Sequence, residues 1–397
     1  TLQSRGLGDV YKRQIRGFVE EMIAISDEEN RLHLKKGRFF KLFFPFQYRK
    51  MWNVRHKTLS DLMDDYVKNP ELQDVLAALW GYYGLPPSKL SGFYYANATG
   101  GYLRNGSYYI RQRSQDLSFA IAEVIEENGG KILYDTAADR ILVEKGVVKG
   151  VELSGGETLP ARAVVSNASA PATFQKMLPE GTVPEDSLKK LGGYKPSISS
   201  FIVWLGLNRD IRDIAGAFST HVSSGLSSDQ DYLAKLDGDI ENGSFGVAIY
   251  DNIFKGYSTP GTSTLQLIFI SGYEPWRRFE ANYKEGNKTR YHLEKARWTD
   301  ILIKRAERDV IPGLSSMIEV KEAATPLTNW RYTGNTDGAI YGFEQSMDNA
   351  YMNRIENHTP IKGLYLAGAW GNPGGGYTGA MRSGEKTFQA LMEEWGG

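Results

Sequence analysis

The residues best placed for chemistry form a glycine-rich loop at 371–376, near the C-terminal end of the sequence. An apolar strand is expected before it at 364–367, and apolar periodicity predicts a helix from about Thr378. Gly374, Gly376 and Gly379 match the spacing GxGxxG. Between a strand and a helix, this pattern points backbone amides and the positive end of the helix dipole at an anionic cofactor group. Tight packing alone is the alternative reading.

The glycine motif does not make a complete dinucleotide fingerprint by itself. That fingerprint needs a second strand and an acidic residue about 20 positions after the glycines, whereas 18 residues follow Gly379. We therefore expect the loop to complete a nucleotide site that begins elsewhere in the sequence. Upstream, Gly334, Gly338 and Gly342 are spaced by four and predict backbone in close approach to a ligand or another strand.

The sequence lacks the residues that several other kinds of catalytic site require. The sequence has no Cys, and its five His include no pair at a metal-ligand spacing, so we expect neither thiolate catalysis nor a metal site. It shows no Ser/His/Asp set and no obvious paired carboxylates. Arg331 and Tyr332 could face a cofactor or make structural hydrogen bonds, so no catalytic residue is assigned.

Composition and charge exclude several classes of protein. The 397 residues carry 47 Lys plus Arg and 47 Asp plus Glu, and this zero net charge argues against a basic nucleic-acid binder. Hydrophobic residues make up 41% and charged residues 24%, which is typical of a folded chain. No run of 18 apolar residues occurs, so we expect no membrane-spanning helix.

The first fourteen residues, TLQSRGLGDVYKRQ, differ in character from the rest of the sequence. They lack the apolar core of a secretory signal, and DVYKRQ at 9–14 resembles the translated adapter of a sequencing library. We expect residues 1–14 to be such an artefact, with a real but frayed terminus as the alternative. The first reading predicts that the chain is the later part of a longer protein.

Residues 32–52 interleave basic and aromatic side chains. One reading is a surface for a membrane or an apolar substrate, where aromatics insert and Lys and Arg meet phosphates. The other is a stripe of core aromatics whose basic neighbours extend to solvent. The basic residues are Lys35, Lys36, Arg38, Lys41, Arg49 and Lys50, and the aromatic ones are Phe39, Phe40, Phe43, Phe44, Phe46, Tyr48 and Trp52.

Periodicity predicts the elements that position these sites. Residues 58–84 and 115–128 have the apolar spacing of helices, ended by LPPS at 85–88 and by Gly129-Gly130. Residues 131–168 read as short strands with turns at Lys145-Gly146 and Gly155-Gly156. Between 171 and 325, bunched strands and one long helix predict an inserted α+β module. The strands are expected at 198–207, 245–251, 264–270 and 316–322, and the helix at 290–310.

Two segments carry a family resemblance. ATPLTNWRYTGNTDGAIYGF at 324–343 and GLYLAGAWGNPGGGYTGAMRSG at 363–384 resemble the C-terminal signature of the phytoene desaturase-like flavoproteins. That group includes bacterial phytoene desaturases, carotenoid (prolycopene) isomerases and retinol saturases. The helix and LPPS at 58–88, and the block at 115–168 that ends in VVSNA, are similar to the same group. The resemblance covers residues 58–168 and 320–397, about half of the chain.

The resemblance implies an α/β fold, a FAD-binding two-dinucleotide-binding-domain (Rossmann-type) architecture with an α+β insert. In that family an N-terminal βαβ unit carries a GxGxxG for the FAD pyrophosphate. Gly6-Leu7-Gly8 does not match it, since Tyr11 takes the place of the third glycine and no strand precedes. The chain is therefore expected to lack this unit. The expected parts are 15–88, helical, aromatic-rich and substrate- or membrane-facing; 89–170 and 326–397, FAD-binding; and 171–325, the substrate domain.

The resemblance also implies the residues that contact FAD. Carried over by position, Gly368 and Ala369 would lie beside the ribityl–pyrophosphate, and the backbone around Ala138 would contact adenine. Backbone amides at the start of the last helix would approach the isoalloxazine ring and favour negative charge on the reduced flavin. Those amides belong to Gly375, Gly376, Tyr377 and Thr378.

Two positions depart from the family pattern. Many relatives carry an acidic residue where this chain has Ala369. The family usually has Gly-Gly where this chain has Gln112-Arg113. Bulky side chains at the second position would crowd the cofactor or reshape its edge.

The family reaction is redox or isomerisation chemistry at C–C bonds of an apolar polyene of the carotenoid or retinoid type. Desaturation and saturation pass a hydride between flavin N5 and a substrate carbon, which needs a dry, aligned tunnel rather than acid–base side chains. The chain is thus expected to come from a FAD-dependent oxidoreductase and, without the βαβ unit, to be inactive alone. The alternatives are a flavin amine oxidase and a non-enzymatic lipid- or prenyl-binding protein on the same fold.

The expected partner is an apolar polyene or lipid-like small molecule, with no nucleic acid and no metal. The basic and aromatic segment at 32–52 adds peripheral membrane contact as an expectation. The expected location is the cytoplasm, and association with a membrane is part of the same expectation.

Overall fold

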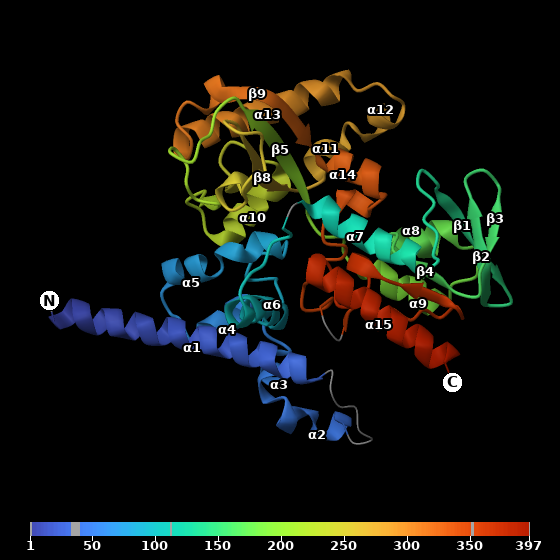
Figure 1. The fold of residues 1–397 in the computed structure, drawn as a ribbon. Helices are drawn as coiled ribbons and strands as arrows, with labels where there is room; N and C mark the ends of the chain where they lie inside the picture. Colours follow the sequence, from blue (N-terminus) through green and yellow to red (C-terminus); the bar gives the residue numbers. More distant parts are fainter. Residues whose placement is uncertain (1, 33–39, 112, 351–352, 397) are drawn as a thin grey trace. The chain divides into compact units, whose positions relative to one another are not determined.

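The protein was analysed as a computed structural model, which describes residues 2–32, 40–111, 113–350 and 353–396 (Figure 1). The chain divides into two compact units, and each is described by itself. Unit 1 comprises Thr1–Tyr108, Leu226–Tyr232 and Glu344–Arg354. Unit 2 comprises Tyr109–Gly225, Leu233–Phe343 and Ile355–Gly397. The division into five parts expected from the sequence stays a prediction.

Unit 1 is mainly helical in its described residues. Its first helix, α1 (Leu2–Leu32), includes residues 9–14 and packs against α6 (Gly92–Asn105). The two helices are so close that a Cβ on Gly100 of α6 would lie 2.2 Å from the carbonyl oxygen of Met22 of α1. Phe18 and Ile25 of the first helix are fully buried. The elements are α1 (Leu2–Leu32), α2 (Phe40–Gln47), α3 (Arg49–Val54), α4 (Leu59–Asp64), α5 (Pro70–Leu76), η1 (Ala78–Tyr82) and α6 (Gly92–Asn105).

The single helix predicted for residues 58–84 is wrong. Thr58 caps α4, and Asn69 caps a separate α5 whose first residue is Pro70. Proline disfavours the helical conformation of the residue before it, so the chain leaves α4 and starts again. Val75, an apolar residue of α5, is 69% exposed, and none of the residues of this helix is buried.

The first part of unit 2 contains the glycine loop. The meander β1–β2–β3 turns at Lys145-Gly146 and Gly155-Gly156, as predicted. Residues 131–137, expected to begin the strands, form none, and Leu133 and Tyr134 are exposed. The elements are α7 (Ser114–Glu127), β1 (Ala138–Glu144), β2 (Val147–Leu153), β3 (Thr158–Pro160), β4 (Val164–Ser166), α8 (Ala170–Ala172), η2 (Thr173–Met177), α9 (Glu185–Gly192), β10 (Leu364–Leu366), η7 (Gly368–Trp370) and α15 (Tyr377–Trp395).

The bunched strands and the long helix expected between 171 and 325 are present, whereas the bounds of an inserted module stay a prediction. The five strands form one antiparallel sheet in the order β6-β7-β8-β5-β9, and α13 lies alongside that sheet (Figure 1). The strands are β5 (Ser199–Leu207), β6 (Ser219–Val222), β7 (Phe245–Ala248), β8 (Ser263–Ser271) and β9 (Ile318–Ala324). The helices are α10 (Ser228–Asp237), η3 (Tyr250–Asn252), α11 (Glu274–Arg277), α12 (Glu280–Lys284), α13 (Thr289–Asp309), η4 (Leu314–Met317), α14 (Pro326–Thr333) and η5 (Thr336–Gly338).

Aromatic packing holds this sheet to its helices. Trp276 is fully buried and stacks on Phe201 of β5 with ring centroids 5.8 Å apart. It also meets the edge of Trp298 from α13 at 4.8 Å. Large buried rings contribute most of the apolar burial that stabilises a core.

The described residues include neither a membrane-spanning helix nor a cluster placed to bind a metal ion. None of their helices has an apolar stretch long enough to cross a bilayer. No cluster of three His, Asp or Glu residues in that part of the chain is placed to bind a metal ion.

We expect Trp276→Ala to lower the free energy of unfolding of unit 2 by about 3–5 kcal/mol, because it leaves a cavity among aromatic rings. Trp204→Ala is the matched control, since Trp204 lies on β5 and is 42% exposed. Denaturant unfolding followed by far-ultraviolet circular dichroism measures both. Equal midpoints for the two variants would contradict this account of the core.

Candidate functional site

The glycine loop is positioned by a pair of short parallel strands. β10 pairs with β4 in the register Leu364↔Val164 to Leu366↔Ser166. The ladder continues one residue further, where the amide of Ala367 donates to the carbonyl oxygen of Ser166 at 2.9 Å. The loop thus leaves from the carboxyl end of a parallel strand pair, the edge at which open α/β sheets bind ligands.

Several glycines of this region are required by packing. A Cβ on Gly368 would lie 2.1 Å from the side-chain oxygen of Asn167. A Cβ on Gly375 would lie 2.7 Å from the carbonyl oxygen of Tyr341, and one on Gly342 would lie 2.3 Å from that of Ala369. The loop and the segment at 341–342 therefore touch backbone to backbone, which supports the tight-packing reading at these positions.

Gly376 differs from its neighbours. It has φ of +82°, and a Cβ built on it would meet no atom within 4 Å. It is exposed, as are Tyr377 and Thr378. Open space therefore faces the backbone at the point where the loop becomes α15.

The N-terminus of α15 is free of groups that would compete with an anion. Gly376 is its N-cap residue, no side chain caps it, and its first turn has no Asp or Glu. The first N–H groups of a helix have no partner within the helix, and the helix dipole adds positive potential there. An uncapped amide cluster beside an open, side-chain-free backbone fits the negatively polarised edge of a flavin ring.

Asn357 holds the loop, the strand and the helix together. Its amide nitrogen donates to the carbonyl oxygen of Ser383 at 2.8 Å and to the hydroxyl of Thr387 at 2.8 Å, both on α15. Its side-chain oxygen accepts from the amide of Asn372 in the loop at 2.7 Å. Its backbone carbonyl accepts from the amide of Leu366 on β10 at 2.7 Å. The side chain is 6% exposed, so these bonds form away from water.

Further polar contacts fix the two ends of the site. Trp370 is buried, and its indole N–H donates to the side-chain oxygen of Asn335 at 2.9 Å. Lys386 donates to the side-chain oxygen of Asn372 at 2.9 Å. At the far end of α15, the Tyr365 hydroxyl donates to Glu394, and burial together with that carboxylate raises the pKa of Tyr365.

The predicted cofactor-contacting residues fall into two groups. Six of the seven lie on the loop and helix start that follow β10: Gly368, Ala369, Gly375, Gly376, Tyr377 and Thr378. Ala138 begins β1, pairs with Leu153, and makes no described contact with that loop. Its role at adenine stays a prediction.

The other candidates are placed as follows. Arg331 and Tyr332 are exposed on α14, and the Tyr283 hydroxyl, as a hydrogen-bond partner, raises the pKa of Arg331. Gln112 lies outside the described residues. Arg113 donates to the carbonyl oxygen of Tyr257 at 2.9 Å, so its side chain is engaged with that residue. Asn357 and Asn167 were missed by sequence reasoning, because a single Asn in a loop carries no periodic signal.

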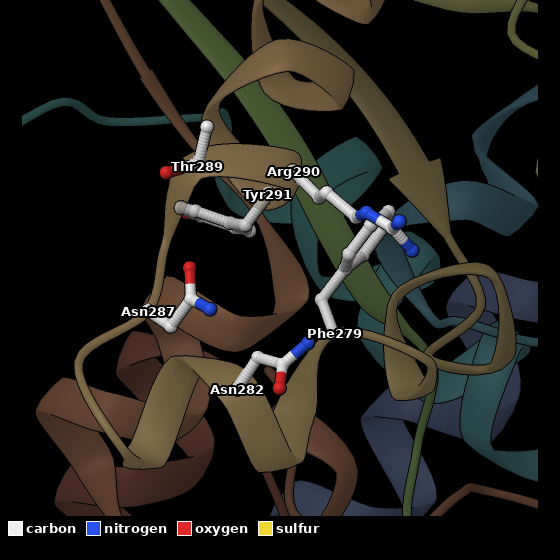
Figure 2. Close-up of a pocket in the computed structure, with 6 residues that line it drawn as sticks. All are labelled: Phe279, Asn282, Asn287, Thr289, Arg290 and Tyr291. Carbon is white, nitrogen blue, oxygen red and sulfur yellow. The ribbon is translucent and has the colours of Figure 1, made fainter.

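Two of the concave sites in the described part of unit 2 are lined by residues outside the glycine loop. The first has a volume of about 320 Å³ and is lined by residues of the α12–α13 region, as Figure 2 shows. Its lining residues are Phe279, Asn282, Asn287, Thr289, Arg290 and Tyr291. The second, of about 230 Å³, is an apolar groove between α7 and residues 132–134.

Other apolar side chains of this part are exposed as well. Among described strands, β4 pairs only with β10, and Val165 of β4 is 48% exposed. The exposed apolar side chains on the two helices of this part include Phe119, Ile121, Val124 and Ile125 on α7, and Met381, Phe388 and Met392 on α15. Together these residues and Val165 are called the uncovered face. Soluble proteins seldom leave such a surface without a partner.

We expect Gly375→Ala to lower the free energy of unfolding by about 1–3 kcal/mol, because the new Cβ would press on the Tyr341 carbonyl oxygen. Gly384→Ala on α15 is the control. It meets nothing within 4 Å and should instead stabilise the helix by about 0.5–1 kcal/mol. Thermal unfolding of both variants measures the effect. A shift of the midpoint temperature in the same direction for both variants would refute the packing argument.

We expect Asn357→Leu to cost about 2–4 kcal/mol, because several buried groups lose their hydrogen-bond partner together. Asn128→Leu is the control, since Asn128 is exposed and makes one bond, to the Val124 carbonyl oxygen. Chemical unfolding midpoints compare the two. A loss no larger than that of the control would show that Asn357 does not hold the segments together.

The sequence is similar to two kinds of curated protein. The sequence is 26% identical over 338 residues to an all-trans-retinol 13,14-reductase of Danio rerio, covering 79% of this chain and 54% of the relative. It is 28% identical over 273 residues to a chloroplastic prolycopene isomerase of Daucus carota, covering 67% and 41%. The chain thus spans about half the length of the curated relatives it matches.

Solved structures share the fold at low sequence identity. An oxidoreductase from Methanosarcina mazei superposes with a TM-score of 0.55 at 17% identity, over 85% of this chain and 68% of the other. A redesigned putrescine oxidase superposes with a TM-score of 0.60 at 10% identity, over 98% and 76%. These matches confirm the expected α/β flavoprotein fold. Residues 45–392 match the family described as flavin containing amine oxidoreductase, and the chain therefore belongs to that family.

Proposed function

We propose that the chain belongs to a FAD-dependent oxidoreductase that acts on C–C bonds of an apolar polyene. The observation that carries the proposal is the open, uncapped start of α15, where Gly376 presents bare backbone beside free helix amides. The retinol reductase and prolycopene isomerase relatives support the substrate class, since both are named for polyenes.

The chain's own residues would hold the cofactor by backbone rather than by charge. The amides of Tyr377 and Thr378 would donate to the negatively polarised edge of the ring, and Gly376 would let the ring approach. Asn357 would keep those amides in line by fixing the loop to α15. A bound flavin supplies the acceptor or donor of a hydride, so the protein needs no acid–base side chain for that step.

The uncovered face indicates what the site still requires. β4 has one edge without a described neighbour, and apolar side chains of α7 and α15 are exposed in the same unit. We propose that a nucleotide-binding βαβ unit pairs with this edge, covers the face and contributes the pyrophosphate site. It would also give residues 131–137 a neighbouring strand. Their backbone N–H and C=O groups require such a neighbour before this segment can form a strand.

Two other functions compete with this proposal. A flavin amine oxidase fits the family and the fold, and the putrescine oxidase match favours it through the fold alone. A non-enzymatic binder of lipid or prenyl groups fits the lack of an assigned catalytic side chain.

We place the protein in the cytoplasm with peripheral membrane contact, as expected for an apolar substrate.

We expect the protein expressed from the complete reading frame that contains this chain to show the visible absorption bands of a flavin, and FAD to be released on denaturation. Gly376→Val should lose the cofactor, because its side chain would fill the open approach. Gly181→Val is the control, since Gly181 also has positive φ and open surroundings. The 397-residue chain alone should bind FAD weakly.

Activity would then be read from the absorption spectrum of an added polyene, which shifts when its conjugation changes. Oxidation of an amine by the same preparation, with no change in any polyene, would favour the amine oxidase. A folded but colourless protein would favour the lipid-binding alternative.

A further inference from the structure

One face of α2 is used for packing within unit 1. Phe40, Phe44, Tyr48 and Trp52 recur every four residues and form a ladder of rings. The ring centroids are 5.6 Å apart for Phe40 and Phe44, 5.1 Å for Phe44 and Tyr48, and 6.3 Å for Phe44 and Trp52. The ladder continues into α3, whose residue Met51 is buried. Tyr48 is buried and the other three rings are half-buried, so these four side chains pack on one another rather than facing solvent.

The opposite face of α2 has no such use. Leu42 is 67% exposed, Phe43 48% and Phe46 82%. Their spacing of one and four residues places them on one side of the helix, away from the ladder. Three large apolar side chains on a single eight-residue helix thus face outward together. These three residues are called the outer face of α2.

The sequence segment that contains α2 carries charges of one sign. Residues 30–60 contain nine Lys or Arg and no Asp or Glu, within a chain whose net charge is zero. Arg49, the first residue of α3, is exposed. Glu21 of α1 pairs with Lys50, so acidic groups from the neighbouring helix offset part of this charge. Lys35, Lys36 and Arg38 lie outside the described residues, and they enter only as sequence charge.

We propose that α2 lies in the headgroup layer of an anionic lipid bilayer, with Leu42, Phe43 and Phe46 inserted and the surrounding Lys and Arg meeting lipid phosphates. Aromatic and aliphatic side chains on one face, flanked by basic residues, are the features that hold a short helix at a membrane interface. An anionic surface complements a segment without a single carboxylate. The proposal gives the membrane contact of the proposed function its surface and its lipid chemistry.

The test uses vesicle binding, which needs neither flavin nor polyene and so can fail while the proposed chemistry stands. The full chain is sedimented with vesicles of phosphatidylcholine alone or mixed with phosphatidylglycerol. We expect binding to the mixed vesicles, weakened by added salt. Phe46→Ser and Leu42→Ser should each weaken it about tenfold, since each removes most of one inserted apolar side chain.

Matched controls separate insertion from general stickiness. Tyr108→Ser replaces a ring that is 86% exposed, and Leu293→Ser a leucine that is 69% exposed, and both should bind like the wild type. Circular dichroism confirms that each variant is folded. Equal binding by all four variants, equal binding to phosphatidylcholine alone, or tighter binding to single-stranded RNA than to mixed vesicles would overturn the proposal.

Discussion

The buried side chain of Asn357 is the constraint on which the candidate site depends. One carboxamide joins a loop amide on its oxygen side to two acceptors of α15 on its nitrogen side, while its own carbonyl receives the β10 amide. The strand, the loop and the helix cannot move separately without breaking bonds that are shielded from water. The open start of α15 is therefore a fixed feature of the backbone and not a product of one flexible loop.

The glycines of the loop differ in what surrounds them. At Gly368 and Gly375 a side chain would strike protein atoms: the Asn167 side chain at Gly368 and the Tyr341 backbone at Gly375. At Gly376 a side chain would strike nothing, and the space it would fill lies beside the start of α15, which no side chain caps. The tight-packing interpretation therefore holds at the first two positions, and the cofactor interpretation stays a prediction for the third.

Local patterns in the sequence predicted most of this arrangement. The inserted sheet, α7, α13 and α15 follow from apolar periodicity and turn glycines, and the loop follows from its spacing. The break at Asn69-Pro70 was missed although the sequence carries its signals, an Asn that can cap a helix followed by Pro at the first helical position. The strand expected within 131–137 failed for another reason, since a strand is stabilised by hydrogen bonds to a neighbour. Asn357 was beyond prediction, because its side-chain partners lie 15 to 30 residues away in sequence and meet it only in the fold.

Exposed apolar surface occurs in both units, and its surroundings indicate what could cover it. The uncovered face includes Val165 of β4, a strand that has backbone donors and acceptors on its free edge. A neighbouring strand satisfies that edge and a lipid does not, because unpaired backbone groups are costly in an apolar medium. On the outer face of α2 the backbone is helical, and the charge of the segment is basic. A headgroup layer suits that surface, since its water and polar groups can bond the ends of the helix and its anions pair with the basic side chains.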